Sequence, residues 1–538
     1  MNTAEALVKL LENAGVKHIF GHPGEQILPV YRALQDSSIE HILVRHEQAG
    51  AHAASMYACS TGKFSVCIST ASPGALNFVM AAATSYKDHV PILILTGDNP
   101  YSERLEDRFQ TFDLPSVFEN VTVKNYAPTN AKEAIHALKE AIEIFNKEPT
   151  GPIHINLPKD VLNEEAPSNY LDYPVEYDPN YNYNQLNLLK TIISSSKKPF
   201  IIAGAGVVWS GACLKLKEFA EKNNIPIATT YTARGVIDEN NPINLGMVGL
   251  RGTAMSNYAY LNSDLILVLG SRLSERTTAL TKDLNDFQQK IVHVNIDEHV
   301  LKGRLKIHGD VSHVLDELNK IEIDSYNNKQ WLKEIKLHDE KLLVEGEDDT
   351  RSMPLRPQVA IKTVIGKMDD AYIMSDAGSH ATWTMLYARP NKFGKFLYSG
   401  ALCPMGMGLP GSIGISLAHP DDRVLVITGD GSFQMCIQEL ATIAEYNLPI
   451  VICVINNNQL AIIRQWEEMI SPDFRYQVDL KNPDFLAIVK GYGIDGERVV
   501  NIEQLEKALL KAKDSNGPYF IEVLTRQENI PLSEVKPQ

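Results

Sequence analysis

Residues 424–458 read VLVITGDGSFQMCIQELATIAEYNLPIVICVINNN, and this segment is the clearest indication of the fold class. Its two apolar runs, 424–428 and 450–455, have the length and composition of buried β-strands, and the residues between them are long enough for a helix. Two buried strands joined by a helix are the building unit of a parallel sheet. Because ligands of open parallel sheets bind beyond the carboxyl ends of the strands, the polar residues that follow each run are candidates for a site.

Asp430 and Asn457 follow the two strands and offer a carboxylate and an amide oxygen, which are ligands of a hard cation such as Mg²⁺. Gly429 and Gly431 let the main chain approach a phosphate closely, and the helix that starts near Ser432 directs its amide groups at that anion. The spacing therefore favours a metal-bridged diphosphate. An ordinary Asp-Gly turn with an Asn-rich strand end is the alternative, and it is the minority interpretation because both polar groups follow buried strands.

Short apolar runs alternate with helical patterns along most of the chain, which predicts an α/β protein with three doubly wound parallel-sheet domains. The expected strands are 64–69, 90–96, 153–157, 200–203, 265–269, 291–294, 424–428, 450–455 and 519–524. Two stretches, 163–184 and 324–357, break this rhythm and are interpreted as linkers, the second with a charged helix. They predict an N-terminal domain at 1–165, a central nucleotide-fold domain at 185–325 and a C-terminal domain at 355–538.

The composition of the chain excludes several classes of protein. Its 538 residues carry a formal net charge of −15, and such an acidic chain repels phosphate backbones, so no nucleic-acid partner is expected. No apolar run is long enough to span a bilayer, and the start of the chain has the pattern of an amphipathic helix (Leu7, Leu10, Leu11) rather than an export signal. Six scattered cysteines without a CxxC pair are typical of buried thiols in a reducing compartment. We expect a cytoplasmic protein that does not associate with membranes.

The motifs GDG at 429–431 and NN at 456–457 resemble the signature of thiamine-diphosphate enzymes. In that family the residues that match Asp430 and Asn457 bind the metal ion. A main-chain oxygen at the position of Gln459 assists them. The resemblance therefore implies thiamine diphosphate and Mg²⁺ as cofactors and a C-terminal domain that binds both.

The segment DAGSH at 376–380 resembles the second diphosphate loop of the family, which implies cofactor contacts for Gly378, Ser379 and His380. A glycine-rich stretch with Met405 lies between the two loops. In this family a bulky apolar residue at that position bends the cofactor, so that its exocyclic amine comes close to the reactive thiazolium carbon. The alternative role for so flexible a side chain is the filling of a core.

Residues 41–61 read HILVRHEQAGAHAASMYACST, an apolar strand that runs into Glu47 and an alanine-rich helix. A surface ion pair is the ordinary explanation of such a glutamate. The pattern resembles the pyrimidine-binding domain of the same family, in which the matching Glu hydrogen-bonds a ring nitrogen of the aminopyrimidine and promotes the tautomer that deprotonates the thiazolium carbon. The family places this domain of one subunit against the diphosphate domain of another. The resemblance therefore implies a homodimer or a homotetramer.

Several segments resemble the catalytic subunit of acetohydroxyacid (acetolactate) synthase over nearly the whole chain. Residues 21–31 resemble its segment GYPGGxxxPVY. Gln110 and Lys124 stand where that family has active-site residues, and Trp466 matches the Trp that shapes the pocket for the second 2-oxo acid. A Trp that anchors a helix is the alternative for Trp466.

In the middle of the chain, Gly204 and Gly206 follow one expected strand, and Arg272 and Asp297 follow two others. Strand-end glycines and a later Asp suit a dinucleotide fold, although the strict GxGxxG spacing is absent. In the family that the chain resembles, the matching segments bind FAD, and the Arg at the position of Arg272 helps to orient the second substrate. A nucleotide fold without flavin is the alternative, because many relatives retain this domain without it.

The chain departs from the family pattern at several places. GGA is replaced by GEQ at 24–26, and TSGPGATN by TASPGALN at 70–77. RFDDR is replaced by RLSER at 272–276, and GQH by GSH at 378–380. These changes leave the cofactor chemistry intact, but they bear on FAD and on the acceptor.

The function implied by the resemblance is that of an acetolactate synthase catalytic subunit. It decarboxylates pyruvate on thiamine diphosphate and couples the resulting enamine to a second 2-oxo acid, a step of branched-chain amino acid biosynthesis. A small regulatory subunit is a further partner that the family allows. Two alternatives stay open: a decarboxylase of another 2-oxo acid that protonates the enamine, and a non-catalytic, nucleotide-binding regulatory paralogue.

Overall fold

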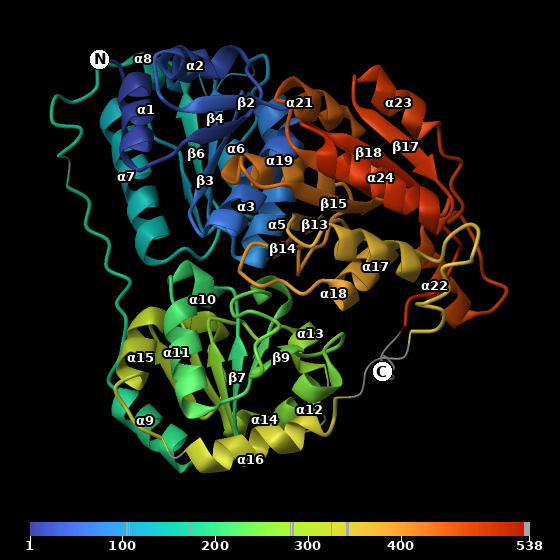
Figure 1. Ribbon diagram of the computed structural model, residues 1–538. Coiled ribbons are helices and arrows are strands. Elements are labelled where there is room, and N and C mark those ends of the chain that lie inside the picture. Colours follow the sequence, from blue (N-terminus) through green and yellow to red (C-terminus); the bar gives the residue numbers. More distant parts are fainter. Residues whose placement is uncertain are drawn as a thin grey trace. The chain divides into compact units, whose positions relative to one another are not determined.

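The computed structural model describes residues 1–531 except 104, 105, 107, 173, 280, 282, 283, 324 and 340–343. The described residues form two compact units. The first contains Met1–Asp178, Gly346–Tyr387 and Leu397–Ile530, and the second contains Pro179–Glu345 and Ala388–Phe396. Two of the three sheets lie in the first unit, one blue to teal and one orange to red in Figure 1, and the third sheet lies in the second unit, in green to yellow.

The N-terminal sheet of the first unit has six parallel strands in the order β2-β1-β3-β4-β6-β5. The strands are β1 (His18–Gly21), β2 (Glu40–Leu43), β3 (Ser65–Ser69), β4 (Ile92–Asp98), β5 (Lys124–Tyr126) and β6 (Ile153–Pro158). The helices are α1 (Thr3–Asn13), α2 (Leu28–Gln35), α3 (Glu47–Thr61), α4 (Ser72–Ala75), α5 (Val79–Asp88), α6 (Leu114–Phe118), α7 (Ala131–Lys147) and α8 (Lys159–Asn163), with the 3-10 turns η1 (Glu25–Ile27), η2 (Leu76–Phe78) and η3 (Tyr101–Glu103). The central strands are buried along their length, as expected for a parallel sheet with helices on both faces.

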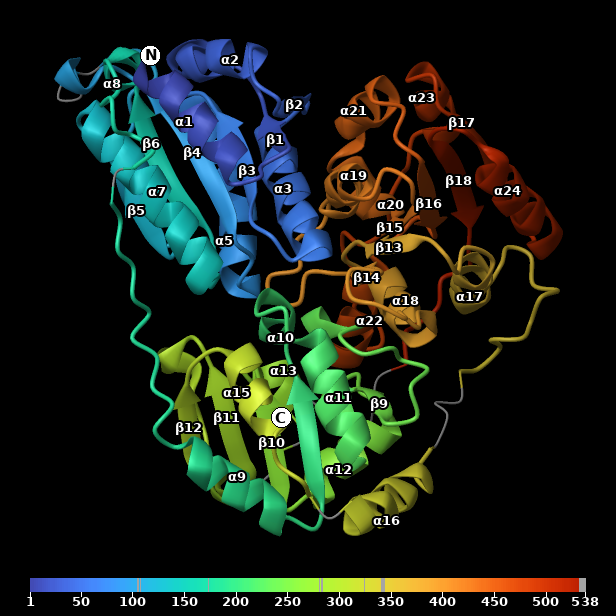
Figure 2. The same ribbon diagram turned by 60° about the vertical axis from the view of Figure 1, so that its left-hand side comes forward.

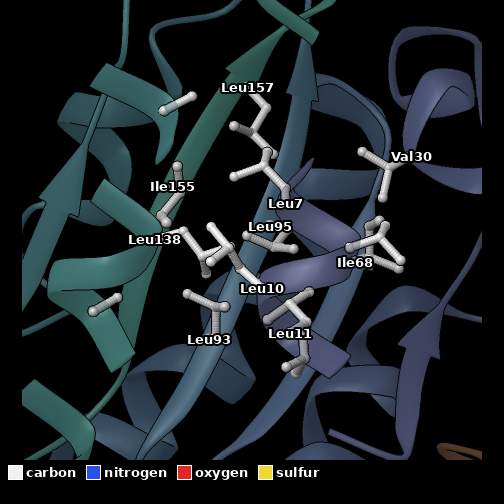
Figure 3. Close-up of a cluster of buried hydrophobic side chains, with 14 of the residues drawn as sticks. Leu7, Leu10, Leu11, Val30, Ile68, Leu93, Leu95, Leu138, Ile155 and Leu157 are labelled. Carbon is white, nitrogen blue, oxygen red and sulfur yellow. The ribbon is translucent and has the colours of Figure 1, made fainter. Parts of the chain in front are cut away.

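One face of this sheet is covered by α1 and α7, and Figure 3 shows the core between them. Leu7 and Leu11 of α1 and Leu138 of α7 pack with Leu93 and Ile155 of the sheet. The apolar face predicted for the first helix is therefore the face that is buried.

The sheet of the second unit has the order β12-β11-β10-β7-β8-β9 (Figure 2). Its strands are β7 (Pro199–Ala203), β8 (Ile227–Thr229), β9 (Asn244–Met247), β10 (Leu265–Leu269), β11 (Ile291–Asn295) and β12 (Leu305–His308). Its helices are α9 (Leu186–Ser195), α10 (Gly206–Trp209), α11 (Cys213–Asn223), α12 (Ala254–Asn262), α13 (Glu275–Thr278), α14 (Leu284–Lys290), α15 (Val311–Leu318) and α16 (Ser325–Lys336), with η4 (Tyr231–Ala233) and η5 (Glu298–Val300).

Helix α16 lies inside the second stretch that we interpret as a linker from the sequence, and this interpretation is wrong for the helix. Trp331 and Ile335 are buried in the same cluster as Phe200 of β7. The indole N–H of Trp331 donates a hydrogen bond of 3.2 Å to the main-chain oxygen of Pro199. A helix with few apolar residues packs on a sheet when those residues fall on one side, although most of its sequence is polar.

The C-terminal sheet of the first unit has the order β14-β13-β15-β16-β18-β17. Its strands are β13 (Tyr372–Ser375), β14 (Phe396–Leu397), β15 (Val424–Gly429), β16 (Ile450–Asn456), β17 (Asp495–Val499) and β18 (Tyr519–Leu524). The helices are α17 (Pro357–Lys367), α18 (Ser379–Tyr387), α19 (Gly408–Ala418), α20 (Asp430–Gln434), α21 (Leu440–Glu445), α22 (Ala461–Ile470), α23 (Phe485–Gly491) and α24 (Ile502–Asp514), with η6 (Ile437–Glu439).

Three parallel sheets with interleaved helices confirm the α/β class predicted from the sequence. Each of the expected strands is present, with ends that differ by two residues or fewer. Between α8 and α9 the described residues contain no helix or strand, as expected for the first linker. The bounds of the three domains stay predictions.

Within the first unit, α3 packs against α19, and both views show the two helices side by side (Figures 1 and 2). A Cβ atom on Gly414 would lie 2.0 Å from the main-chain oxygen of Ala53. One on Gly411 would lie 2.8 Å from Cγ of Met56. The helices approach this closely only because α19 has glycine at these positions.

Candidate functional site

Two loops meet at the carboxyl edge of the C-terminal sheet. Strand β13 ends at Ser375 and its loop leads into α18, whereas β15 ends at Gly429 and leads into α20. The two strands are neighbours in the sheet. The hydroxyl group of Ser432 donates a hydrogen bond of 2.7 Å to the main-chain oxygen of Ala377 and so joins the loops. The structure therefore brings the two predicted diphosphate segments together.

The ring of His380 lies between these loops. A Cβ atom on Gly378 would lie 2.6 Å from its Cε1, and one on Gly429 would lie 3.0 Å from its Nδ1. The ring is 4% exposed, and burial lowers its pKa to about 4, so the imidazole is neutral. Its Nε2 is shielded from solvent and has no hydrogen-bond partner among the described residues. This nitrogen is therefore available for a hydrogen bond with a bound group.

Asp376, a residue for which no role is predicted from the sequence, ties these loops to Met405. Its buried carboxylate accepts hydrogen bonds from the main-chain N–H groups of Gly406 at 3.1 Å and Gly408 at 2.9 Å. Burial raises the pKa of Asp376 to about 6. The terminal carbon of Met405 lies 3.2 Å from the position of a Cβ atom on Gly431, so the methionine lies against the loop that follows β15.

Asp430 and Asn457 lie at the ends of the neighbouring strands β15 and β16, and both are buried. Burial raises the pKa of Asp430 to about 6, and the hydrogen bonds that lower it come from the amide of Asn482 and from main-chain N–H groups. The side-chain oxygen of Asn457 accepts a hydrogen bond of 3.1 Å from the main-chain N–H of Gln459. The three residues predicted to hold the metal ion are thus adjacent.

These residues fit a magnesium ion with a diphosphate. Their donor atoms are carboxylate, amide and main-chain oxygens, which are hard ligands. Asp430 is a buried acid that accepts hydrogen bonds from neutral groups, the amide of Asn482 and main-chain N–H groups, so a divalent cation would offset the cost of its burial. Among the described residues, no group of three His, Cys, Asp or Glu could hold a metal ion.

Glu47 is the first residue of α3 and lies at the carboxyl edge of the N-terminal sheet. The amide of Asn77 donates a hydrogen bond of 2.8 Å to its Oε2, and a Cβ atom on Gly74 would lie 2.8 Å from its Oε1. The hydroxyl group of Ser72, in the same short helix as Gly74, donates a hydrogen bond of 2.7 Å to the main-chain oxygen of Gln110. The structure therefore places Gln110 at the edge that carries Glu47.

Lys124 does not lie at that edge. It is the first residue of β5 and pairs in register with Ile153, the first residue of β6, so it lies at the amino edge. At a rise of about 3.3 Å per residue, the two edges are on the order of 15 Å apart. Its ammonium group pairs with Glu140 and lies over the ring of Tyr126. A catalytic role for Lys124 stays a prediction that its position relative to Glu47 does not favour.

Glu439 of η6 holds the main chain that precedes Glu47, and no motif of the sequence points to it. Its side chain is fully buried, and its two oxygens accept the main-chain N–H of Arg45 at 3.0 and 3.2 Å. The hydroxyl group of Thr442 donates to Oε2 at 2.9 Å. Burial raises the pKa of Glu439 to about 7. No pattern in the sequence marks such a residue, because an acid in a helical segment is usually exposed.

Trp466 lies on α22 and its side chain is 48% exposed. Other residues anchor the helix: Gln465 exchanges two hydrogen bonds of 2.9 Å with the main chain of Ile530. The buried Arg464 forms an ion pair with Glu468. The indole is therefore not the anchor of this helix, and it is accessible to a ligand.

The residues predicted to bind FAD follow the ends of three adjacent strands of the second unit. Gly204 and Gly206 follow β7, Arg272 follows β10 and Asp297 follows β11. Gly204 and Gly206 are required because the main chain of another loop passes close to them. A Cβ atom on Gly204 would lie 2.3 Å from the main-chain oxygen of Gly270, and one on Gly206 would lie 2.7 Å from its Cα. Asp297 caps η5 with its side chain. These contacts explain the two glycines without a nucleotide, and FAD stays a prediction.

Two further observations concern the described part of the chain. None of its helices is both long and apolar enough to cross a membrane. The six cysteines are free thiols. Cys67, Cys436 and Cys453 are buried as predicted, and Cys59, Cys213 and Cys403 are partly exposed.

Comparison with protein families gives three matches that together follow the order of the sheets. Residues 1–117 match the N-terminal TPP binding domain of thiamine pyrophosphate enzymes, and residues 186–318 match their central domain. Residues 376–523 match their C-terminal TPP binding domain. The last match includes both loops of the candidate site.

Individual relatives match over nearly the whole chain. A probable acetolactate synthase large subunit of Methanocaldococcus jannaschii is 36% identical over 97% of this chain and 92% of the relative. An acetolactate synthase of Arthrospira platensis is 34% identical over 98% and 94%. The acetolactate synthase isozyme 2 large subunit of Escherichia coli K12 is 30% identical over 98% and 97%.

Proposed function

The chain belongs to the acetolactate synthase large-subunit family of thiamine pyrophosphate enzymes, and from this premise we propose how its residues carry out the reaction. The substrates proposed are pyruvate and a second 2-oxo acid, which are joined with loss of CO₂. The observation that carries the proposal is the meeting of two loops and a buried acid at one sheet edge, where Asp430, Asn457 and His380 fit a metal-bridged diphosphate.

We propose that Asp430, the side chain of Asn457 and the main-chain oxygen of Gln459 hold Mg²⁺. The first diphosphate loop contributes Gly429, Gly431 and Ser432, and the second contributes Gly378, Ser379 and His380. The unpartnered Nε2 of His380 supports this assignment, because a neutral imidazole can donate a hydrogen bond to a phosphate oxygen there. When bound, thiamine diphosphate supplies the nucleophilic carbon that attacks the carbonyl group of the 2-oxo acid.

Glu47 is proposed to hold a proton at a ring nitrogen of the aminopyrimidine. Two contacts support this role: the amide of Asn77 fixes one carboxylate oxygen, and Gly74 leaves room at the other. Met405 is proposed to support the bent form of the cofactor, since it lies against the loop after β15 and its own loop is tied down by Asp376.

Trp466 is proposed to select the second 2-oxo acid, and Gln110 to contact it; for Arg272, the role in orienting that substrate rests on the family match alone. The exposed indole of Trp466 and the position of Gln110 at the edge of Glu47 support these roles. An active-site role for Lys124 is proposed on the family match alone. FAD binding at the strand ends of the second unit is a separate proposal, and a yellow colour of the purified protein would support it.

We propose that a second copy of the chain completes the site, in a homodimer or homotetramer, because the family places Glu47 of one chain against the metal end of another. Several of the relatives are described as large subunits, which supports a small regulatory subunit as a partner. A role in branched-chain amino acid biosynthesis and a place in the cytoplasm are proposed on the same ground.

The proposal is tested by incubating the purified protein with pyruvate, thiamine diphosphate and Mg²⁺. Acetolactate as the main product supports it. Acetaldehyde without acetolactate identifies a decarboxylase instead, and absence of turnover together with absence of cofactor binding favours a non-catalytic paralogue. Addition of 2-oxobutyrate then determines which acceptor is preferred.

A further inference from the structure

Asn482 lies on the segment after α22 and contacts the ends of both strands of the proposed metal site. Its amide nitrogen lies 2.7 Å from Oδ2 of Asp430, 3.0 Å from Oδ1 of Asn456 and 3.1 Å from Oδ1 of Asn458. Its amide oxygen accepts a hydrogen bond of 2.9 Å from Gln434. One side chain thus joins α20 to the end of β16.

Three oxygens surround an amide nitrogen that carries only two hydrogens. This amide group alone therefore cannot satisfy all three oxygens, and Oδ1 of Asn456 also accepts a hydrogen bond of 3.0 Å from the main-chain N–H of Asn458. Asn482 reduces the repulsion among these oxygens, and the bond to Asp430 is the shortest because its acceptor is a carboxylate.

We propose that Asn482 is a positioning residue for the active-site cation. By binding Oδ2 of Asp430, it holds the carboxylate in one orientation before the metal ion arrives. The inference rests on the proposed function, to which the cation belongs. The family signature ends with Asn457, so Asn482 is not part of the signature that identifies the metal ligands.

The main chain around Asn482 is held by contacts other than its own side chain. The N–H of Leu480 donates a hydrogen bond of 2.8 Å to the main-chain oxygen of Asn458. Gln459 and Asp479 form an antiparallel bridge, which a hydrogen bond of 2.9 Å between their side chains reinforces. Replacement of Asn482 is therefore expected to remove the amide without displacing the segment.

The test compares Asn482→Leu with the matched variant Asn501→Leu. Asn501 caps α24 in the same unit and accepts a hydrogen bond of 3.0 Å from the main-chain N–H of Gln504. Binding of Mn²⁺ in the presence of thiamine diphosphate is measured by electron paramagnetic resonance, without substrate. We expect Asn482→Leu to weaken Mn²⁺ binding about 10- to 100-fold, the usual effect of removing a group that orients a metal ligand, and Asn501→Leu to leave it unchanged.

Equal Mn²⁺ affinity of wild type and Asn482→Leu overturns the inference. An equal loss of Mn²⁺ affinity in Asn482→Leu and Asn501→Leu also overturns it, because it would indicate a general destabilisation of the unit. If Asn482→Leu does not fold, Asn482→Ser removes the amide with a smaller side chain and carries the same expectation. The product assay on pyruvate judges the proposed function separately. If the wild-type protein binds Mn²⁺ but forms no product, the proposed function is refuted, and the ratio of Mn²⁺ affinities between wild type and Asn482→Leu still tests the role of Asn482. If the wild-type protein binds no Mn²⁺, both the proposed function and the role of Asn482 are overturned.

Discussion

The buried carboxyl group of Glu439 makes the stability of the first unit depend on pH, and Glu439→Gln is expected to remove this dependence. Burial raises its pKa from 4.5 to about 7. Between these values the folded chain keeps a proton that the unfolded chain releases, so the free energy of unfolding falls as the pH rises. Because one pKa unit corresponds to about 1.4 kcal/mol, the full loss above pH 7 is on the order of 3 kcal/mol.

The assay is urea unfolding of the cofactor-free wild type and variant at pH values of about 5 and about 8. The stability of Glu439→Gln relative to wild type is expected to increase by about 2.5 kcal/mol between the two, because part of the full loss has already occurred at pH 5. Asp376 and Asp430, whose pKa values are also raised, to about 6, titrate in both proteins and cancel in the difference. Glu503→Gln, which changes an exposed acid in α24, is the control and should leave the pH dependence of wild type unaltered.

A constant offset between the Glu439→Gln variant and wild type is expected in addition, because the new NH₂ group faces the main-chain N–H of Arg45. If the two proteins lose stability in parallel as the pH rises, the reasoning is refuted. The hydrogen bonds from Arg45 and Thr442 would then offset the cost of burying the charge.

Three other substitutions test the site and its support. Glu47→Gln is expected to abolish acetolactate formation while thiamine diphosphate still raises the melting temperature, because an amide cannot hold the proton at the ring nitrogen; near-normal activity contradicts this role. Gly414→Val is expected to lower the free energy of unfolding by about 1–3 kcal/mol in a denaturant titration, since its Cβ would overlap the main-chain oxygen of Ala53. An unchanged unfolding midpoint would contradict the close packing of α3 against α19. Asp376→Asn is expected to weaken thiamine diphosphate binding about tenfold in a thermal-shift titration. Its NH₂ group would face the N–H groups of the loop that carries Met405. Equal affinities of variant and wild type contradict this supporting role of Asp376.

Much of the fold could be predicted from the sequence, because buried parallel strands consist of continuous apolar runs. The strands β15 and β16 and the loops after them are where the sequence places them. Asp430 and Asn457 could be found for the same reason: each follows an apolar run at a fixed spacing. The error at α16 has the opposite cause, since two buried residues, Trp331 and Ile335, outweigh a mostly polar composition.

The supporting residues of the site could not be predicted. The contacts of these residues, Asp376, Glu439 and Asn482, are with main-chain groups or with residues far away in the chain. Contacts of these two kinds produce no periodic pattern in the sequence. In a sequence, a buried acid looks like any exposed acid, because only the fold determines whether it is desolvated. Lys124 shows the converse: a family match assigns it to the active site, but only the register of β5 with β6 shows at which edge it lies.

The close approach of the loops after β7 and β10 has a consequence for how glycine motifs are used in genome annotation. Gly204, Gly206 and Gly270 stand at a crossing of two backbones, where any side chain would collide with the opposite loop. Purifying selection on folding alone is enough to preserve all three. A relative that no longer binds a nucleotide would keep the same three glycines. Flavin-binding members of the family should therefore be identified by their colour and bound cofactor rather than by these glycines.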